Sequence, residues 1–97
     1  MTMKTPHPGE TLKEEYLVPL GMSVNALAKE LGIGAARLNE IVLGRRGVSA
    51  DTALRLARYF GTTPELWLNL QVFYELWMAQ RKAGRTIERT VKPRQAA

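Results

Sequence analysis

A short stretch near the middle of the chain concentrates side chains that can recognise nucleic acid. Arg37 and Asn39 stand two residues apart, and the pair Arg45 and Arg46 follows between two glycines. An arginine can pair bidentately with guanine and an asparagine with adenine, whereas arginines in a loop suit phosphates. Phosphates would repel Glu40. We therefore expect its carboxylate either to orient one of the loop arginines or to accept a hydrogen bond from cytosine N4. The stretch therefore predicts base contacts from Arg37 and Asn39, and backbone contacts from the loop.

These side chains also have simpler interpretations. Arg37 and Asn39 could be ordinary solvated polar residues, or could contact only phosphates. Ser23 and Asn25 could add a phosphate contact through their side chains and the exposed amides of a helix N-terminus. Ser23, however, would cap that helix with or without DNA. The prediction therefore depends on the elements that position these groups.

Residues 23–43 have the spacing of a helix-turn-helix. Ser23 suits the N-cap of a helix that runs to Leu31, and a second helix spans about residues 35–43. Ala28 is small where two helices that cross at about 90–120° must approach each other. Gly32 tolerates the positive φ that the turn needs. The pattern is moderately specific because the small residue and the glycine occur at the right mutual distance.

The second of these helices would lie in the major groove of DNA. At about 100° per residue, a helix that turns its apolar residues inward presents Ala36 and Glu40 outward, with Arg37 and Asn39 on the flanks. Ala36 therefore joins the candidate contact residues.

Three further helices complete an all-α prediction of five helices without a strand. Caps, prolines and apolar periods place them at about residues 8–18, stopped by Pro19, at 50–60 after the Ser49 cap, and at 64–83 before Gly84. We therefore expect an N-terminal segment of residues 1–7, a single domain of residues 8–83, and a flexible basic tail of residues 84–97.

The fifth helix, residues 64–83, is apolar over more than one face. One stripe comprises Trp67, Leu70, Phe73, Tyr74 and Trp77, and further apolar residues cover much of the rest. A helix of this kind in a small domain must be buried on two sides, so we expect the stripe to form a homodimer. A two-fold dimer would place two recognition helices about 34 Å apart. The alternative is one enlarged core around the two tryptophans.

The net charge of +5 is not spread evenly along the 97 residues. Residues 79–97 carry six basic side chains and one acidic, whereas residues 1–78 carry eight of each. The excess of basic over acidic residues therefore lies in the tail and not in the helix-turn-helix. The tail could contact DNA phosphates, contact an acidic partner, or only aid solubility.

Several classes of function lack the residues they need. The chain has no cysteine, and its one histidine, His7, stands without a second ligand at metal-binding spacing and could instead cap the first helix. Gly32-Ile33-Gly34 follows a predicted helix and lacks the third glycine of a dinucleotide site. No nucleophile has a base beside it. We therefore expect no enzyme, metal or cofactor, and no membrane segment, in a cytoplasmic protein.

An ordered series of motifs closely resembles the HigA family of antitoxins, which is VapI-like and belongs to the Xre, or Cro/C1-type, helix-turn-helix class. The series covers about residues 6–78. It comprises Pro6-His7-Pro8-Gly9-Glu10, the helix-turn-helix, Arg37-Leu38-Asn39-Glu40-Ile41-Val42, Gly44-Arg45-Arg46-Gly47, Asp51-Thr52-Ala53-Leu54-Arg55-Leu56-Ala57 and Phe60 to Gln71. The fold implied is a five-helix, lambda-repressor-like domain with a longer C-terminal helix.

The resemblance implies a dimeric antitoxin that neutralises a HigB-like, mRNA-cleaving toxin and represses its own operon at a palindromic operator. Arg37 and Asn39 match the family's recognition helix, and Arg45 and Arg46 match its basic loop. Because that motif is shared, operator choice would rest more on Gly34, Ala35 and Ala36. Two alternatives are a solitary Xre-type regulator without a toxin, and a toxin-binding module with little role at DNA.

Overall fold

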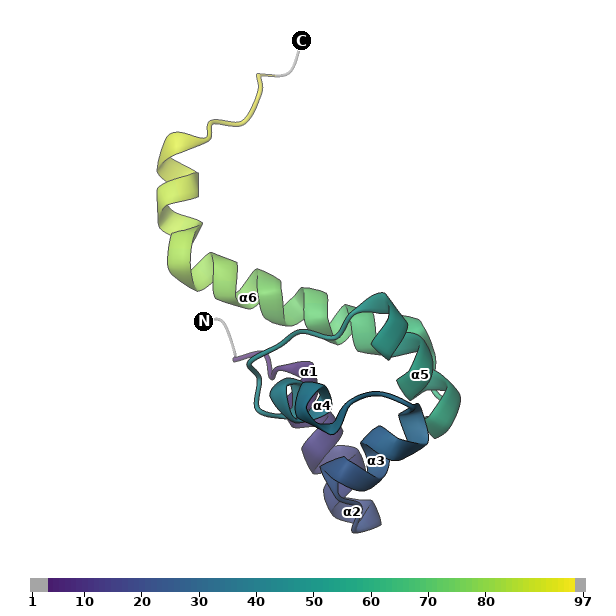
Figure 1. The fold of residues 1–97 in the computed structure, drawn as a ribbon. Coiled ribbons are helices and arrows are strands. Elements are labelled where there is room, and N and C mark those ends of the chain that lie inside the picture. The colour runs from purple at the N-terminus through teal and green to yellow at the C-terminus, as the bar shows by residue number, and fades with distance from the viewer. Residues whose placement is uncertain (1–3, 96–97) are drawn as a thin grey trace.

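The computed structural model describes residues 4–95, and within that range every regular element is helical (Figure 1). This confirms the all-α prediction. The elements in chain order are α1 (Pro8–Leu12), the π-helical turn η1 (Lys13–Leu17), α2 (Val18–Leu20), α3 (Val24–Leu31), α4 (Ala35–Val42), α5 (Ala50–Phe60) and α6 (Pro64–Thr90). Of the predicted terminal segments, residues 1–3 and 96–97 lie outside the described part of the chain.

The first helix does not stop at Pro19, as the sequence had suggested, but continues through α1, η1 and α2 to Leu20. A proline inside a helix lacks an N–H and its ring clashes with the carbonyl four residues earlier. Just before Pro19 the helix widens, and the Val18 N–H donates to the Lys13 carbonyl five residues back. This π turn makes room for the proline ring. The helix ends instead at Gly21, which adopts a left-handed φ of 62°.

His7 caps the start of this helix, as its position had suggested. Its Nδ1 accepts a hydrogen bond of 2.9 Å from the Gly9 N–H, and its ring lies edge-on to Tyr74 with 4.9 Å between centroids. The side chain is buried, and this burial lowers the pKa of His7, although the nearby Glu10 carboxylate acts in the opposite direction. The neutral imidazole is also the form that can accept at Nδ1. The cap therefore couples α1 to α6.

One apolar core joins the helices. Trp67, Leu12, Leu27, Leu38, Ile41 and Leu56 are among its largest fully buried side chains. Burial of each such side chain contributes about 1.5–3 kcal/mol before the loss of entropy is counted. Within this core α1 crosses α4 in direct backbone contact. A Cβ placed on Gly9 would lie 1.8 Å from the Ile41 carbonyl oxygen, so only glycine fits the crossing.

Helix α6 is longer than the sequence analysis predicted. It begins with the expected Thr63 cap and Pro64, but it continues past Ala83 to Thr90. Gly84 is helical and is not among the glycines with positive φ, so it does not act as a C-cap. A glycine costs about 1 kcal/mol inside a helix without ending it, and Lys82, Ala83 and Arg85 are good helix formers. Residues 84–90 of the predicted flexible tail are therefore helical, and this end of α6 projects from the body (Figure 1).

The Gly9 crossing makes a stability prediction. Gly9→Ala should force α1 and α4 apart and destabilise the fold by about 3 kcal/mol, as overpacked cores do. For a domain of this size that corresponds to a fall in Tm of roughly 12–24 °C. Circular dichroism melts at a fixed protein concentration would measure it. Gly34→Ala is the matched control, because a Cβ at Gly34 meets nothing within 4 Å and its φ is −68°. Equal Tm values for the two variants would contradict the proposed steric role of Gly9.

Candidate nucleic-acid interface

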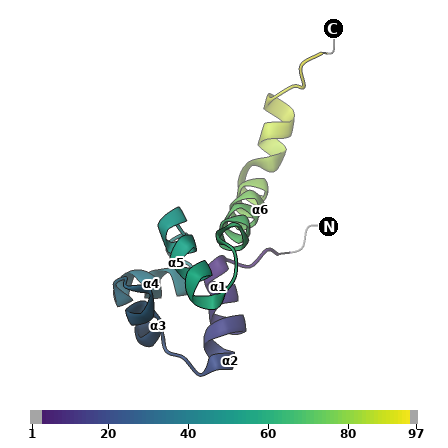
Figure 2. The ribbon, with the colours of Figure 1, turned by 90° about the vertical axis from the view of Figure 1, so that its right-hand side faces the viewer.

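Helices α3 and α4 form the predicted bihelical unit, on the side of the body away from α6 (Figure 2). Ser23 Oγ accepts from the Ala26 N–H at 3.0 Å and so caps α3. Gly32 ends α3 with a left-handed φ of 70°, and the Ile33 N–H then donates to the Ala28 carbonyl at 3.1 Å. These bonds satisfy the end of α3 and turn the chain into α4. The geometry is that of a helix-turn-helix.

The residues of α4 divide between core and solvent along the helical period. Leu38 and Ile41 are completely buried, whereas Ala36, Arg37 and Asn39 are exposed. The remaining two candidates on this helix, Ala35 and Glu40, are half-buried. The exposed face thus presents a guanidinium, an amide and a small side chain together. Those are the groups that base recognition in a major groove requires.

Arg37 leans toward the start of the next helix. Its guanidinium lies 3.4 Å from Ser49 Oγ, the group that caps α5 by accepting from the Thr52 N–H at 3.2 Å. The contact of Arg37 is long and exposed to water, so releasing it costs little. Arg37 can therefore swing from Ser49 to a ligand without loss of the α5 cap.

Glu40 pairs with one of the two loop arginines, as the sequence predicted. Its carboxylate lies 3.8 Å from the Arg45 guanidinium, and the side chains of Arg45 and Glu40 are 70% and 42% exposed. An exposed pair of this length contributes about 0–1 kcal/mol, so its effect is on orientation more than on stability. Arg46 is exposed and takes part in neither of the two ion pairs found within residues 4–95. Arg46 is thus the loop cation most available to a phosphate.

Sequence reasoning missed the residue that holds this loop. Gln71 of α6 accepts a hydrogen bond of 2.9 Å from the Val48 N–H, and its amide packs so close that a Cβ on Gly47 would lie 2.9 Å from it. The end of the arginine loop is therefore held by α6, through a residue 23 positions after Val48 along the chain. A polar residue four positions after Trp67, on an otherwise apolar helix face, was the signal that could have revealed it.

A second missed contact fixes α3 against α5. Arg55 donates to the Leu31 carbonyl at 2.8 Å and to the Asp51 carboxylate at 2.7 Å. The first bond satisfies a free carbonyl at the end of α3, and the second holds the guanidinium in place. The four-residue spacing of Asp51 and Arg55 on one helix was the available sequence signal.

At the start of α3, Ser23 and Asn25 have different roles. Ser23 and Asn25 are both exposed, but Ser23 Oγ is already engaged as the cap. A phosphate at this end would therefore meet backbone N–H groups and the Asn25 amide, while Ser23 keeps its structural bond.

The aromatic stripe assigned to dimerisation lies mainly inside the protomer. Trp67 is 0% exposed, contacts Tyr16 at 5.2 Å between ring centroids, and donates from Nε1 to Thr62 Oγ1 at 2.9 Å. Trp77 is 8% exposed, and Leu70 and Tyr74 are half-buried. Of the five predicted residues only Phe73 is open to solvent. The prediction was wrong for Trp67 because this side of α6 packs on α1 and α5.

The second apolar face of α6 does exist, but with other members. The exposed apolar side chains on the first two-thirds of the helix are Leu66, Val72, Phe73, Leu76 and Met78. At about 100° per residue, Val72, Phe73 and Leu76 lie opposite Trp67 and Tyr74. We call these three residues the outer face of α6.

Two other kinds of site are absent from residues 4–95. No group of three or more His, Cys, Asp or Glu side chains there could hold a metal ion. None of the helices in that range has the length and apolar character needed to cross a membrane.

Comparisons with known proteins agree with this geometry. A family model described as "Helix-turn-helix" matches residues 12–67. Virulence-associated protein I of Dichelobacter nodosus is 57% identical over 75 residues, which cover 77% of this chain and 69% of that protein.

Two solved structures are similar over nearly the whole chain. An addiction-module antidote protein of the HigA family from Coxiella burnetii is 52% identical, with a TM-score of 0.91, and the match covers 95% of this chain and 100% of that one. Antitoxin HigA of Pseudomonas aeruginosa, solved with the higBA promoter, is 43% identical with a TM-score of 0.91, over 94% and 99% of the two chains. The chain therefore belongs to the Xre-type helix-turn-helix family and, within it, to the HigA antitoxins.

Proposed function

We propose that this protein is a cytoplasmic antitoxin that represses its own operon by binding a palindromic operator as a homodimer. The observation that carries the proposal is the exposed face of α4, where Arg37 and Asn39 stand beside the Arg45–Arg46 loop in helix-turn-helix geometry. The Pseudomonas relative solved with promoter DNA supports it. The activity is binding, without catalysis or a cofactor.

On this proposal α4 enters the major groove with its N-terminal residues toward the bases. Arg37 leaves Ser49 to pair with guanine, and Asn39 faces an adenine. Ala35 and Ala36 are small enough to let the helix approach thymine methyl groups closely. Specificity then comes from a few hydrogen bonds combined with close apolar contact.

The loop and the start of α3 contact the DNA backbone on either side of α4. Arg46 binds a phosphate directly, and Arg45 does so while Glu40 limits its position. The free N–H groups near Asn25 bind a phosphate at the N-terminus of α3. These contacts fix the register of α4 without reading sequence.

The outer face of α6 is the surface we propose for the homodimer. Phe73 is 56% exposed, Leu76 53% and Val72 48%, which is unusual for large apolar residues that lie close together. A second copy of the same helix would cover them and give the two-fold symmetry of a palindromic operator. This surface replaces the stripe that includes Trp67.

Paired arginine variants test the DNA contacts. Arg37→Ala should reduce discrimination at one operator base pair by about 1–3 kcal/mol. Arg46→Ala should instead weaken binding to all sequences alike and lower the salt slope by about 0.9 for each lost phosphate contact. Fluorescence anisotropy with the promoter upstream of the gene, and with single-base variants of it, would measure both. Absence of binding by the wild-type protein would refute the proposal.

Two substitutions on α6 test the dimer. Phe73→Glu with Leu76→Glu should yield a folded monomer, because two carboxylates cannot be buried against their copies in the partner. Leu54→Glu is the control, since Leu54 is 60% exposed but lies on α5. Sedimentation equilibrium would give the mass of each variant. A dimeric double variant would show that another surface pairs the protomers.

Co-expression tests the antitoxin role and the two alternative functions. If a small toxin-like reading frame adjoins the gene, the protein should restore growth to cells that express it and should co-elute with its product. An Arg37/Arg45/Arg46 triple alanine variant should lose operator binding and keep neutralisation. Failure to rescue growth would favour a solitary regulator. Unchanged repression by the triple variant would favour a toxin-binding module with little role at DNA.

A further inference from the structure

The net positive charge of this protein lies in residues 79–97, which comprise the end of α6 and the segment after it. Residues 1–78 carry equal numbers of basic and acidic side chains, whereas residues 79–97 carry six basic and one acidic. A protein whose body is neutral exerts little long-range attraction on a polyanion. Any such attraction must therefore come from residues 79–97.

Four of these basic residues share one face of the helix. At about 100° per residue, Arg81, Lys82, Arg85 and Arg89 fall within a stripe about 100° wide. All four are exposed, and neither ion pair found within residues 4–95 involves them. We call them the basic stripe.

Within residues 4–95, no ion pair neutralises the stripe, and its first member is held by an aromatic ring. The Arg81 guanidinium lies over the Trp77 ring, 4.8 Å from its centroid, which fixes the first member against the buried part of α6. Arg89 makes an exposed contact of 3.5 Å with Thr86 Oγ1. Like charges four residues apart destabilise a helix slightly, so an anion that spans them would relieve their repulsion.

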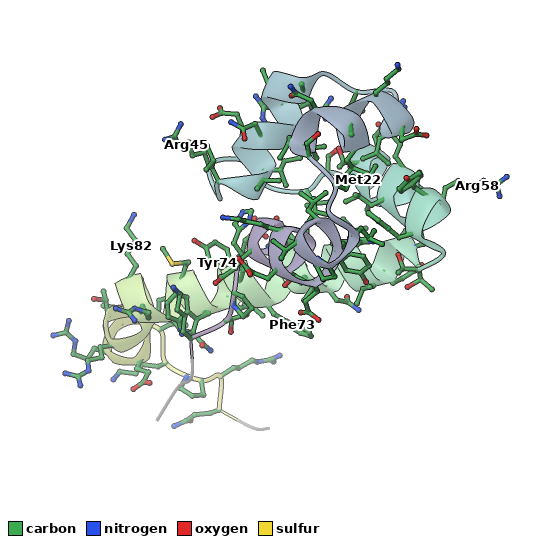
Figure 3. The ribbon with its side chains drawn as sticks, turned by 90° about the horizontal axis from the view of Figure 1, so that it is seen from below. Met22, Arg45, Arg58, Phe73, Tyr74 and Lys82 are labelled. Atoms are coloured by element: carbon green, nitrogen blue, oxygen red, sulfur yellow. The ribbon has the colours of Figure 1, made fainter. Side chains whose placement is uncertain are left out.

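One member of the basic stripe, Lys82, lies at the same end of the molecule as the loop arginine Arg45 (Figure 3). In Figure 3, Lys82 and Arg45 lie at the same end and point toward the side occupied by α3 and α4, while Arg58 points away from the opposite end. A duplex that contacts Arg45 and continues past this end of the molecule would thus meet the stripe first at Lys82 (Figure 3).

We propose that the basic stripe binds phosphates of duplex DNA outside the base pairs read by α4, without regard to their sequence. This inference rests on the proposed operator binding and adds a second contact to it. Three of the four side chains are arginines, whose planar guanidinium binds phosphate oxygens bidentately. The stripe would supply the electrostatic attraction that the neutral body lacks.

The test is a triple variant, Lys82→Gln with Arg85→Gln and Arg89→Gln. Glutamine is a good helix former, so α6 should stay folded, as circular dichroism would verify. Anisotropy titrations between 50 and 200 mM salt would use an operator duplex with about ten extra base pairs on each side. The homodimer would lose six phosphate contacts, three per protomer, which lowers the salt slope by about 5.4. Between 50 and 200 mM salt the affinity of the variant should therefore decrease by a factor about 1,800 times smaller than that of the wild type. A flank-free duplex should show a much smaller difference.

A matched pair of single variants separates location from net charge. Lys82→Gln should lower both affinity and salt slope, whereas Arg58→Gln, with the same change in charge at the opposite end, should lower neither. Equal effects from the two, or an unchanged slope in the triple variant, would overturn the inference while operator binding by the wild type kept the proposed function intact. Unchanged DNA binding with loss of toxin co-elution would overturn it in favour of an acidic protein partner.

Discussion

The direct backbone contact between α1 and α4 is the constraint on which the arrangement of this molecule depends. Because Gly9 has no side chain, α1 approaches the Ile41 carbonyl more closely than any other residue would allow. This contact sets the rotation of α4 about its own axis, with Leu38 and Ile41 in the core. The outward direction of Arg37 and Asn39 is then a consequence of packing on the opposite side of the same helix.

Local signals in the sequence were enough to locate most helices. Caps such as Ser23, Ser49 and Thr63 begin helices where the sequence predicted them, because a cap is satisfied within three residues of itself. Pro19 and Gly84 led to wrong predictions of helix ends. Each residue only disfavours a helix, and the residues around it can outweigh that preference. A widened turn makes room for Pro19, and the helix formers around Gly84 outweigh its cost.

Contacts between distant parts of the chain were harder to predict. The pairing of Glu40 with Arg45 follows from proximity in sequence, whereas the bond from Val48 to Gln71 spans 23 residues and was not foreseen. The two faces of α6 are both apolar, so the period alone does not say which one faces inward. The packing of Trp67 against Tyr16 of the first helix and Phe60 of α5 decides it.

Gln71 connects α6 to the loop that follows α4, and this connection also affects the position of α4 in a dimer. The same helix carries the outer face and, through one amide, holds the chain that follows α4. If two copies pair through that face, the register between their α6 helices determines how far apart the two α4 helices stand. A slip of one helical turn, about 5.4 Å, would change that separation by more than the rise of about 3.4 Å of one base pair. The spacing between operator half-sites would then be a property of α6, and could evolve separately from the bases that α4 reads.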